Sequence, residues 1–299
     1  MSAVTDVGLD SLADFPLPPL SGAGDKEGRG RVLAIGGGAR VPGALILTGI
    51  AALRAGAGKL QLATVASVAV ALGVAVPEAA VLGLAETRDG EVAPDDGGLL
   101  AEAVAGADAV VVGPGMMDET AAGALAERLM AGFGGAAFVL DAAAMTGVHL
   151  ACAAVRRLAG RLILTPHAGE MARLTGLKKE AVEQDPLGAA RAVARDAQAV
   201  VIMKGAESYI VSPDGRAWRH ANGAIGLATS GSGDVLAGVI AGVLARGASP
   251  LAASIWGVCV HGACGARLSQ TVGQVGFLAR ELLPEIPRIM SEAGRGAPT

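Results

Sequence analysis

Thr229-Ser230-Gly231-Ser232-Gly233-Asp234 decides the fold, because these small residues lead directly into an apolar stretch, Val235–Ala245, that reads as a helix. The two glycines leave several backbone N–H groups at the helix start. Unpaired donors and the positive end of the helix dipole favour a phosphate group there. Asp234 falls in the first helical turn. Ser232 or Asp234 is also suited to be a simple N-cap, so on this segment alone both interpretations stay open.

Polar residues follow three other apolar stretches at the point where each is expected to end as a strand. Asp141 follows Phe138–Leu140, Thr165-Pro166-His167-Ala168-Gly169-Glu170 follows Leu162–Leu164, and Lys204-Gly205 follows Val200–Met203. The carboxyl ends of parallel strands meet at one edge of a sheet, where open α/β sheets bind their ligands. We therefore expect these residues to converge with the 229–234 segment.

Short β-rich stretches alternate with helical ones along the chain, which predicts βαβ units in a mostly parallel sheet. Asp214-Gly215 between apolar stretches predicts a hairpin of Tyr209–Val211 with Ala217–Arg219. Neither a repeat nor a linker is visible, so one domain is expected. Further strands are expected at Val32–Ile35, Lys59–Ala63, Ala80–Leu84 and Ala109–Val112, and helices at Pro42–Ala55, Gly98–Val104, Gly169–Thr175, Leu187–Asp196 and about 232–247, 251–269 and 275–291.

Residues 1–28 are rich in Pro, Gly and Asp, and Pro16, Pro18 and Pro19 oppose regular structure there. We interpret them as an N-terminal leader that packs on the surface, with regular structure beginning at Arg31. The domain is then expected to span residues 29–291, followed by a C-terminal tail at 292–299.

Three more glycine-rich segments are present, and the first and third of them follow predicted strands. Gly36-Gly37-Gly38 does not have the GxGxxG spacing of a dinucleotide-binding turn, and no acidic residue closes the next strand. Gly56-Ala57-Gly58-Lys59 lacks the leading glycine of a P-loop. Gly113-Pro114-Gly115 closes the strand 109–112 at its ligand-binding end. For the first and third of these turns, a purely structural role remains open.

Composition excludes several classes of protein. Of 299 residues, 52% are hydrophobic, so disorder is not the dominant state. The net charge is −4 without a basic stripe, which argues against nucleic acid as a partner. Three cysteines without a CxxC pair suit a reducing compartment and no zinc site. No secretory signal and no apolar run of about 18 residues are visible, so we expect a soluble cytoplasmic protein without membrane contact.

Taken together, the segments resemble the ADP-dependent NAD(P)H-hydrate dehydratase family of the ribokinase-like superfamily, over about residues 28–288. The resemblance implies a ribokinase-like three-layer sandwich, with a central, mostly parallel sheet between helices. The combination of Gly-x-Gly-Asp with Thr-Pro-His-x-Gly-Glu is the specific part. The matching segments are Pro42-Gly43-Ala44, Gly113-Pro114-Gly115, Leu140-Asp141-Ala142, Thr165–Glu170, Lys204-Gly205, Gly231–Gly238 and Val260-His261-Gly262.

The resemblance also implies roles for individual residues. Asp234 would face the reacting hydroxyl as general base, and Ala44, Gly115 and His167 would line the site for the hydrated dinucleotide. The adenine nucleotide would be bound by Lys204, Gly205, Ala206, Glu207, Ser208, Gly231, Ser232 and Gly233. Mg²⁺ is the implied cofactor, with its ligands unassigned, and ADP is the implied co-substrate.

The implied reaction is dehydration of the S epimer of hydrated NADH or NADPH, which restores the cofactor and releases AMP and phosphate. Implied partners are a separate NAD(P)H-hydrate epimerase and further copies of the chain in a homotetramer. Two alternatives remain: a kinase of the same superfamily acting on a vitamin-precursor alcohol, and an inert nucleotide-binding module. Gly223-Ala224-Ile225-Gly226 stands where the family usually has Gly-Asn-Pro-Gly, which favours the inert module, whereas Asp234 argues against it.

Overall fold

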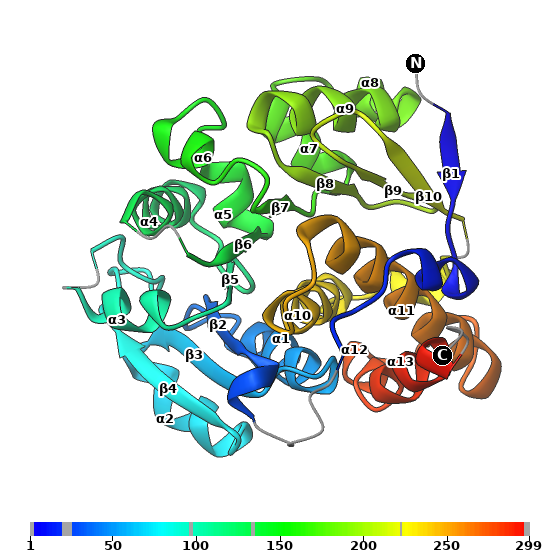
Figure 1. Cartoon of the computed structure of the whole chain (residues 1–299). Helices are drawn as coiled ribbons and strands as arrows, with labels where there is room; N and C mark the ends of the chain where they lie inside the picture. Colours follow the sequence, from blue (N-terminus) through cyan, green and yellow to red (C-terminus); the bar gives the residue numbers. More distant parts are fainter. Residues whose placement is uncertain (1–2, 20–25, 96–97, 133–134, 222, 296–299) are drawn as a thin grey trace.

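The computed structural model describes residues 3–19, 26–95, 98–132, 135–221 and 223–295. These residues form one ten-stranded sheet in the order β1-β10-β9-β8-β7-β6-β5-β2-β3-β4 (Figure 1). Within it, β9 alone runs antiparallel to its neighbours. The strands are β1 Val4–Asp6, β2 Arg31–Ile35, β3 Lys59–Val65, β4 Ala79–Leu84, β5 Ala109–Val112, β6 Ala137–Leu140, β7 Leu162–Leu164, β8 Val200–Met203, β9 Ser208–Val211 and β10 Ala217–His220.

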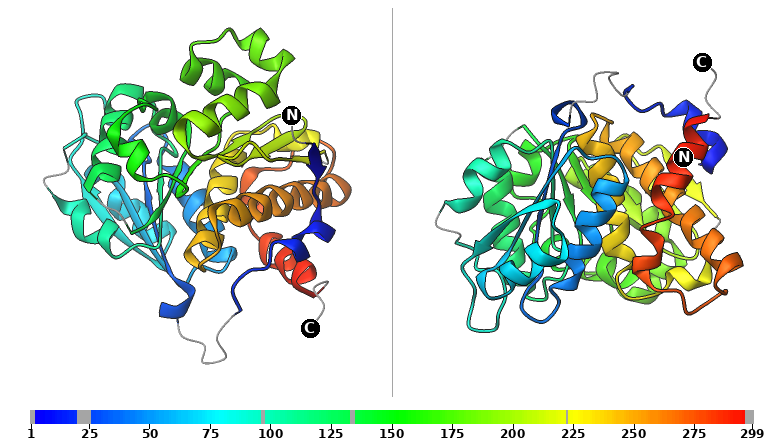
Figure 2. Two further views of the ribbon diagram at one scale, coloured as in Figure 1. Left: turned by 45° about the horizontal axis from the view of Figure 1, so that its top comes forward. Right: turned by 90° about the horizontal axis from the view of Figure 1, so that it is seen from below.

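Helices cover both faces of this sheet (Figure 2). They are α1 Gly43–Arg54, α2 Ala66–Ala75, α3 Leu99–Ala105, α4 Glu119–Gly132, α5 Ala142–Gly147, α6 Ala153–Arg157, α7 Ala168–Thr175, α8 Lys179–Gln184, α9 Pro186–Ala197, α10 Ser232–Ala245, α11 Pro250–Thr271, α12 Ala279–Leu282 and α13 Ile286–Arg295. Successive strand residues point to opposite faces. On β2, Val32 and Ala34 join the core beneath α1, α10 and α11, whereas Leu33 and Ile35 join the core beneath α4 and α9. The expected α/β sandwich of three layers is confirmed.

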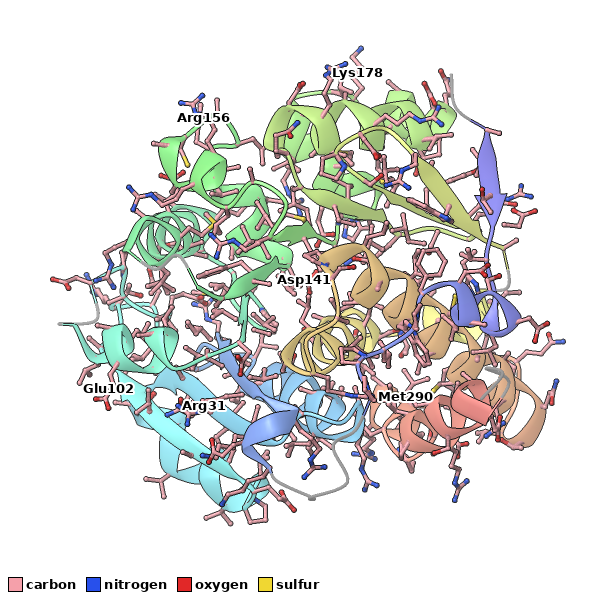
Figure 3. All side chains as sticks on the ribbon, in the orientation of Figure 1. Arg31, Glu102, Asp141, Arg156, Lys178 and Met290 are labelled. Carbon is pink, nitrogen blue, oxygen red and sulfur yellow. The ribbon has the colours of Figure 1, made fainter. Side chains whose placement is uncertain are left out.

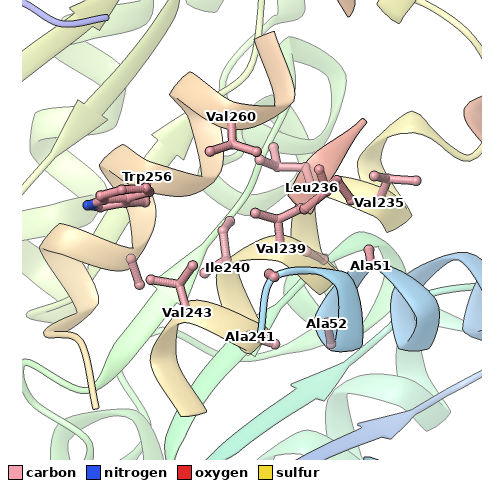
Figure 4. Packing of buried hydrophobic residues seen from close by; sticks show 14 of the residues in the cluster. Ala51, Ala52, Val235, Leu236, Val239, Ile240, Ala241, Val243, Trp256 and Val260 are labelled. Atoms are coloured by element: carbon pink, nitrogen blue, oxygen red, sulfur yellow. The ribbon is translucent and has the colours of Figure 1, made fainter. Parts of the chain in front are cut away.

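Helices α1, α10 and α11 pack closely on one face (Figure 4). Small residues make this approach possible, since a Cβ atom at Gly238 would lie 2.2 Å from the Thr48 carbonyl oxygen and one at Gly242 would lie 2.4 Å from that of Ala52. Val239 and Ile240 of α10 are fully buried at this contact. Burial of such a side chain contributes roughly 1.5–3 kcal/mol. The middle of α10 is thereby held firmly against α1.

The N-terminal residues differ from the expectation of an irregular leader. Val4–Asp6 pairs in parallel with β10, and Asp6 accepts two hydrogen bonds from Arg219, at 2.7 and 3.1 Å. Residues Leu9–Asp14 form a 3-10 helix with Leu12 buried against the core. The expectation that regular structure begins at Arg31 is therefore wrong. At the other end, α13 continues to Arg295, so the expected tail is helical up to that residue, and residues 296–299 lie outside the described part.

Most expected elements are present, including the hairpin of β9 and β10. The single helix expected at 275–291 is instead two helices, α12 and α13, because Pro284 between them cannot continue a helix. Helices α2, α4, α5, α6 and α8 were not expected.

Within the described residues, α11 is long and apolar enough by composition to cross a membrane. However, 72% of its most apolar window is buried inside the structure, as in the core helix of a globular fold.

Candidate active site

Lys204 lies at the centre of a polar cluster at the carboxyl ends of β6, β7 and β8. Its Nζ atom is 3.2 Å from Oδ1 of Asp141 and 3.5 Å from Oε2 of Glu170. Thr165 donates a hydrogen bond of 2.6 Å to the same Oδ1 atom. Burial alone would lower the pKa of Lys204, but the charges of Asp141 and Glu170 outweigh it and the pKa is raised. The predicted convergence of these residues is confirmed, with Asp141 near the middle of the molecule (Figure 3).

The start of α10 completes this cluster. A Cβ atom at Gly233 would lie 3.6 Å from the Lys204 Nζ atom and 3.9 Å from Oδ2 of Asp141, so the backbone of Gly233 faces the ion pair. The N-cap is Gly231, with φ of +90°, and no side chain caps the helix. The alternative in which Ser232 or Asp234 serves as the cap is therefore wrong. The Ser232 N–H donates to the Thr229 carbonyl at 3.3 Å, and the N–H groups that follow it in the first turn of α10 are left for another acceptor.

Asp234 is positioned by its own helix and by α1. Its backbone carbonyl accepts a hydrogen bond of 3.1 Å from the Thr48 hydroxyl, which also lies 3.0 Å from the Ala44 carbonyl. Burial, together with the negative charge of Asp141, raises the pKa of Asp234 to about 7, although Lys204 opposes the shift. A carboxyl group with this pKa is suited to accept and return a proton near neutral pH.

His167 is the N-cap of α7. Its Nδ1 atom accepts hydrogen bonds from the backbone N–H groups of Gly169 and Glu170, at 3.0 and 3.2 Å. Glu170 in turn accepts from the backbone N–H of His167, which completes a capping box. Burial lowers the pKa of His167. With Nδ1 occupied by the cap, Nε2, which lies 3.7 Å from Oε2 of Glu170, is the ring nitrogen that can reach a ligand.

A cavity of about 650 Å³ opens beside the cluster. Among the described residues, its lining includes Lys204, Gly205, Ala206, Ser208, Ser232 and Gly233 from the nucleotide-binding set, and His167 from the dinucleotide set. Gly231 and Glu207 of the nucleotide-binding set are not in the lining. The Glu207 carboxylate instead accepts from the Tyr209 hydroxyl and pairs with Arg219. The family-specific departure at Gly223–Gly226 also borders this cavity, through Gly223, Ala224 and Ile225.

Ala44 and Gly115 lie together outside this lining. A Cβ atom at Gly115, whose φ is +71°, would be 2.9 Å from the Ala44 Cβ and 2.5 Å from the Val41 carbonyl oxygen. The turns at residues 36–38 and 113–115 are joined by hydrogen bonds, since the N–H of Gly37 donates to the Pro114 carbonyl and that of Gly38 donates to the Gly115 carbonyl. A structural role for these glycines is therefore established, beside any contact with a ligand.

Two residues, His261 in the cavity lining and Glu170 in the polar cluster, were absent from the site predicted from the sequence. His261 on α11 lies 2.9 Å through Nε2 from the Ser232 hydroxyl, although only its matching segment was noted. Glu170 was noted for its position, not as a partner of Lys204. Both contacts join residues whose spacing along the chain carries no periodic signal.

The donors present are compatible with Mg²⁺ bound mainly through a nucleotide. In the described part of the chain, no three His, Cys, Asp or Glu side chains group together as a protein-only metal site. Mg²⁺ usually takes one or two carboxylates together with substrate phosphates. Asp141 offers Oδ2, the oxygen that faces Gly233, while Oδ1 is used by Lys204 and Thr165.

Comparison with known proteins gives consistent matches over nearly the whole chain. An ADP-dependent (S)-NAD(P)H-hydrate dehydratase of Xanthomonas campestris is 51% identical over 297 residues, which is 98% of both chains. A bifunctional NAD(P)H-hydrate repair enzyme of Moorella thermoacetica is 37% identical over 92% of this chain, and this chain spans 52% of that protein.

The fold is also similar to a crystal structure of an ADP/ATP-dependent NAD(P)H-hydrate dehydratase from Bacillus subtilis, which was co-crystallised with ATP and Mg²⁺. The TM-score is 0.78 with 26% identity, and the match covers 98% of this chain and all of the other. The ribokinase-like architecture expected from the sequence is thereby confirmed. The family model described as NAD(P)H-hydrate dehydratase matches residues 32–288. With a family match of this extent, the chain belongs to the NAD(P)H-hydrate dehydratase family.

Proposed function

We propose that the protein catalyses ADP- or ATP-dependent dehydration of the S epimer of hydrated NADH or NADPH. The observation that carries this proposal is the placement of Asp234, with its pKa raised to about 7, beside the Lys204–Asp141 ion pair at an uncapped helix start. Family membership supplies the substrate class, because the relatives above are named for this reaction.

The chemistry follows from the leaving group. Hydroxide leaves the hydrated ring slowly, whereas phosphate leaves readily. In the proposed reaction, the terminal phosphoryl group of ADP passes to the ring hydroxyl, and AMP is released. The carbon–oxygen bond to phosphate then breaks, phosphate leaves, and loss of a ring proton restores the dihydronicotinamide.

The chain supplies a base and a positively polarised site for this reaction. Asp234 accepts the hydroxyl proton, a role worth about 10²–10⁴-fold in rate. The backbone N–H groups of Gly231 and Gly233 and the ammonium of Lys204 stabilise charge on the transferred phosphoryl group. Asp141 and Glu170 hold Lys204 in place.

Mg²⁺ belongs to this proposal as a cofactor. Asp141 Oδ2 is the protein ligand that we propose, with phosphate oxygens completing the coordination. When bound, Mg²⁺ would offset negative charge on the phosphates.

One assay distinguishes this function from the alternatives. The protein is incubated with hydrated NADH and ADP or ATP, and the absorbance of reduced nicotinamide is followed together with phosphate release. We expect both to rise together. A kinase acting on a vitamin-precursor alcohol would instead leave the absorbance unchanged and form a stable phosphate ester with its own substrate. An inert module would bind nucleotide without either signal.

We propose that a separate epimerase supplies the S epimer, which is supported by bifunctional relatives of about twice this length. We also propose a homotetramer in the cytoplasm. Exposed apolar residues on α2 support self-association, since Val70 and Val74 are 81% and 79% exposed. Light scattering after size exclusion tests the oligomeric state.

A further inference from the structure

Ser232 and His261 form a hydrogen-bonded pair in the wall of the cavity. Ser232 is the first residue of α10, and His261 lies on α11. The Ser232 Oγ atom and the His261 Nε2 atom are 2.9 Å apart, and the serine is 5% exposed. Both residues line the cavity that contains Lys204 and Gly233.

The hydroxyl of Ser232 has no role in capping its own helix. The N-cap is Gly231, and no side chain accepts the first N–H groups of α10. The position of this hydroxyl is therefore set by His261, while the neighbouring N–H groups are left for an anion.

His261 is neutral at pH 7. Burial lowers its pKa to about 4, and the nearby charge of Lys204 acts in the same direction, although the backbone of Ser232 opposes the shift. A neutral imidazole carries one N–H group, so the pair has two arrangements. Either Nε2–H donates to Oγ, which frees the hydroxyl hydrogen, or the hydroxyl donates to Nε2, which turns only lone pairs toward the cavity.

A phosphate group selects between these arrangements because its oxygens accept hydrogen bonds and repel lone pairs. With Nε2–H donating to Ser232, the serine hydroxyl donates to the phosphate, in line with the N–H groups of α10. The bond from His261 to Ser232 and the bond from Ser232 to the phosphate then point the same way, and each strengthens the other by polarisation.

We propose that His261 is a positioning residue that fixes the Ser232 hydroxyl as a hydrogen-bond donor to the nucleotide phosphate. The inference rests on the proposed function, in that it takes the cavity to be the nucleotide site. His261 thus acts on the phosphate through Ser232, and it adds no charge to the site.

The test uses two replacements of His261 that differ in where they place an N–H donor. His261→Gln puts its amide nitrogen at the distance of Nε2, whereas His261→Asn reaches only as far as Nδ1. Ser232→Ala removes the hydroxyl itself. Dissociation constants of each variant are measured for ADP, AMP and adenosine, and thermal melts show whether each variant is folded.

We expect His261→Asn to weaken ADP binding at least about ten-fold, as loss of a charge-assisted hydrogen bond requires. Adenosine binding should stay within about two-fold, because it has no phosphate. His261→Gln should restore ADP affinity to within about three-fold of the wild type. Ser232→Ala should resemble His261→Asn, and the double variant should be little worse than either single one.

Equal losses for adenosine and ADP, failure of His261→Gln to restore affinity, or fully additive effects would overturn the inference. If His261→Asn does not fold, Ser232→Ala and the His261→Gln comparison still decide it. The outcome is separable from the proposed function: a wild-type protein that binds ADP with this pattern but does not dehydrate hydrated NADH would refute the function and leave the positioning role intact. A wild-type protein that does not bind ADP would refute both.

Discussion

Lys204 is paired with Asp141 across 3.2 Å, and it acts on Asp234 only as a nearby positive charge. Burial and the negative charge of Asp141 outweigh this ammonium group, so the pKa of Asp234 is raised to about 7. An arrangement with Lys204 directly on Asp234 would give a weaker base, because the charged form would be stabilised.

Asp234→Asn should keep ADP affinity within a few-fold and reduce turnover of the hydrate by at least about 10². The amide preserves the shape of the carboxyl group but cannot accept the hydroxyl proton. Single-turnover rates and equilibrium dialysis with ADP measure the two effects. Turnover close to that of the wild type would show that Asp234 is not the base.

The pH profile of hydrate turnover should rise through an apparent pKa near 7, because Asp234 must be deprotonated to act. Asp141→Asn should move this rising limb to lower pH, since it removes a negative charge that raises the pKa of Asp234. The rate is measured from pH 5 to 9 on both proteins. A limb that stays in place would assign it to another group.

Asp234→Asn should also make the fold more stable at alkaline pH. The pKa of Asp234 rises from 3.8 to about 7 on folding, so the folded protein holds a proton that the unfolded chain releases between these values. Stability therefore falls as the pH rises through this window, and the cost is complete above about pH 7. We expect the variant to melt about 2–5 °C higher than the wild type at pH 8, with the advantage lost near pH 4. An equal difference at both pH values would contradict this.

Gly233→Val should impair ADP binding more than folding. The site of the new Cβ atom is 3.6 Å from the nearest side-chain atom, so the fold has room for it, but the side chain would enter the space beside Lys204. Gly238→Ala is the matched control in the same helix, where the Cβ atom would lie 2.2 Å from a backbone oxygen of α1. The control should lose roughly 1–3 kcal/mol of stability. Thermal melts and ADP dialysis on both variants compare them directly.

His167→Ala should weaken binding of the hydrate and also lower the melting temperature, because the side chain caps α7. Loss of a cap costs about 0.5–2 kcal/mol. His167→Asn separates the two roles, since asparagine is a good cap but has no atom in the place of Nε2. We expect the melting temperature of His167→Asn to match the wild type while hydrate affinity falls. An unchanged affinity would leave His167 with the cap alone.

The sheet and the polar cluster could be predicted from the sequence, because both depend on patterns within short stretches of the chain. Buried parallel strands appear as short apolar runs, and residues directly after them must lie at the same edge. Asp141, Lys204 and Glu170 follow this logic, and the ion pairs between them confirm it.

Other features could not be predicted from the sequence, and each has a physical reason. The α2 segment is apolar all round, so it has no 3.6-residue pattern to distinguish it from a loop or strand. The bond between Ser232 and His261 joins two helices and depends on their packing, which no local pattern encodes. The N-cap at Gly231 depends on a backbone conformation with φ of +90°, whereas side-chain preference pointed to Ser232 or Asp234.

The pairing of β1 with β10 has a consequence for the order in which the strands can pair during synthesis. Asp6 and its partner Arg219 are separated by 213 residues. A ribosome adds about 5–20 residues per second, so the first strand would wait on the order of 10–40 s before its partner strand exists. During synthesis, the strands therefore become available from the β2-β3-β4 edge of the sheet toward β10 at the other edge, and β1, the earliest segment to emerge, is among the last to find its place.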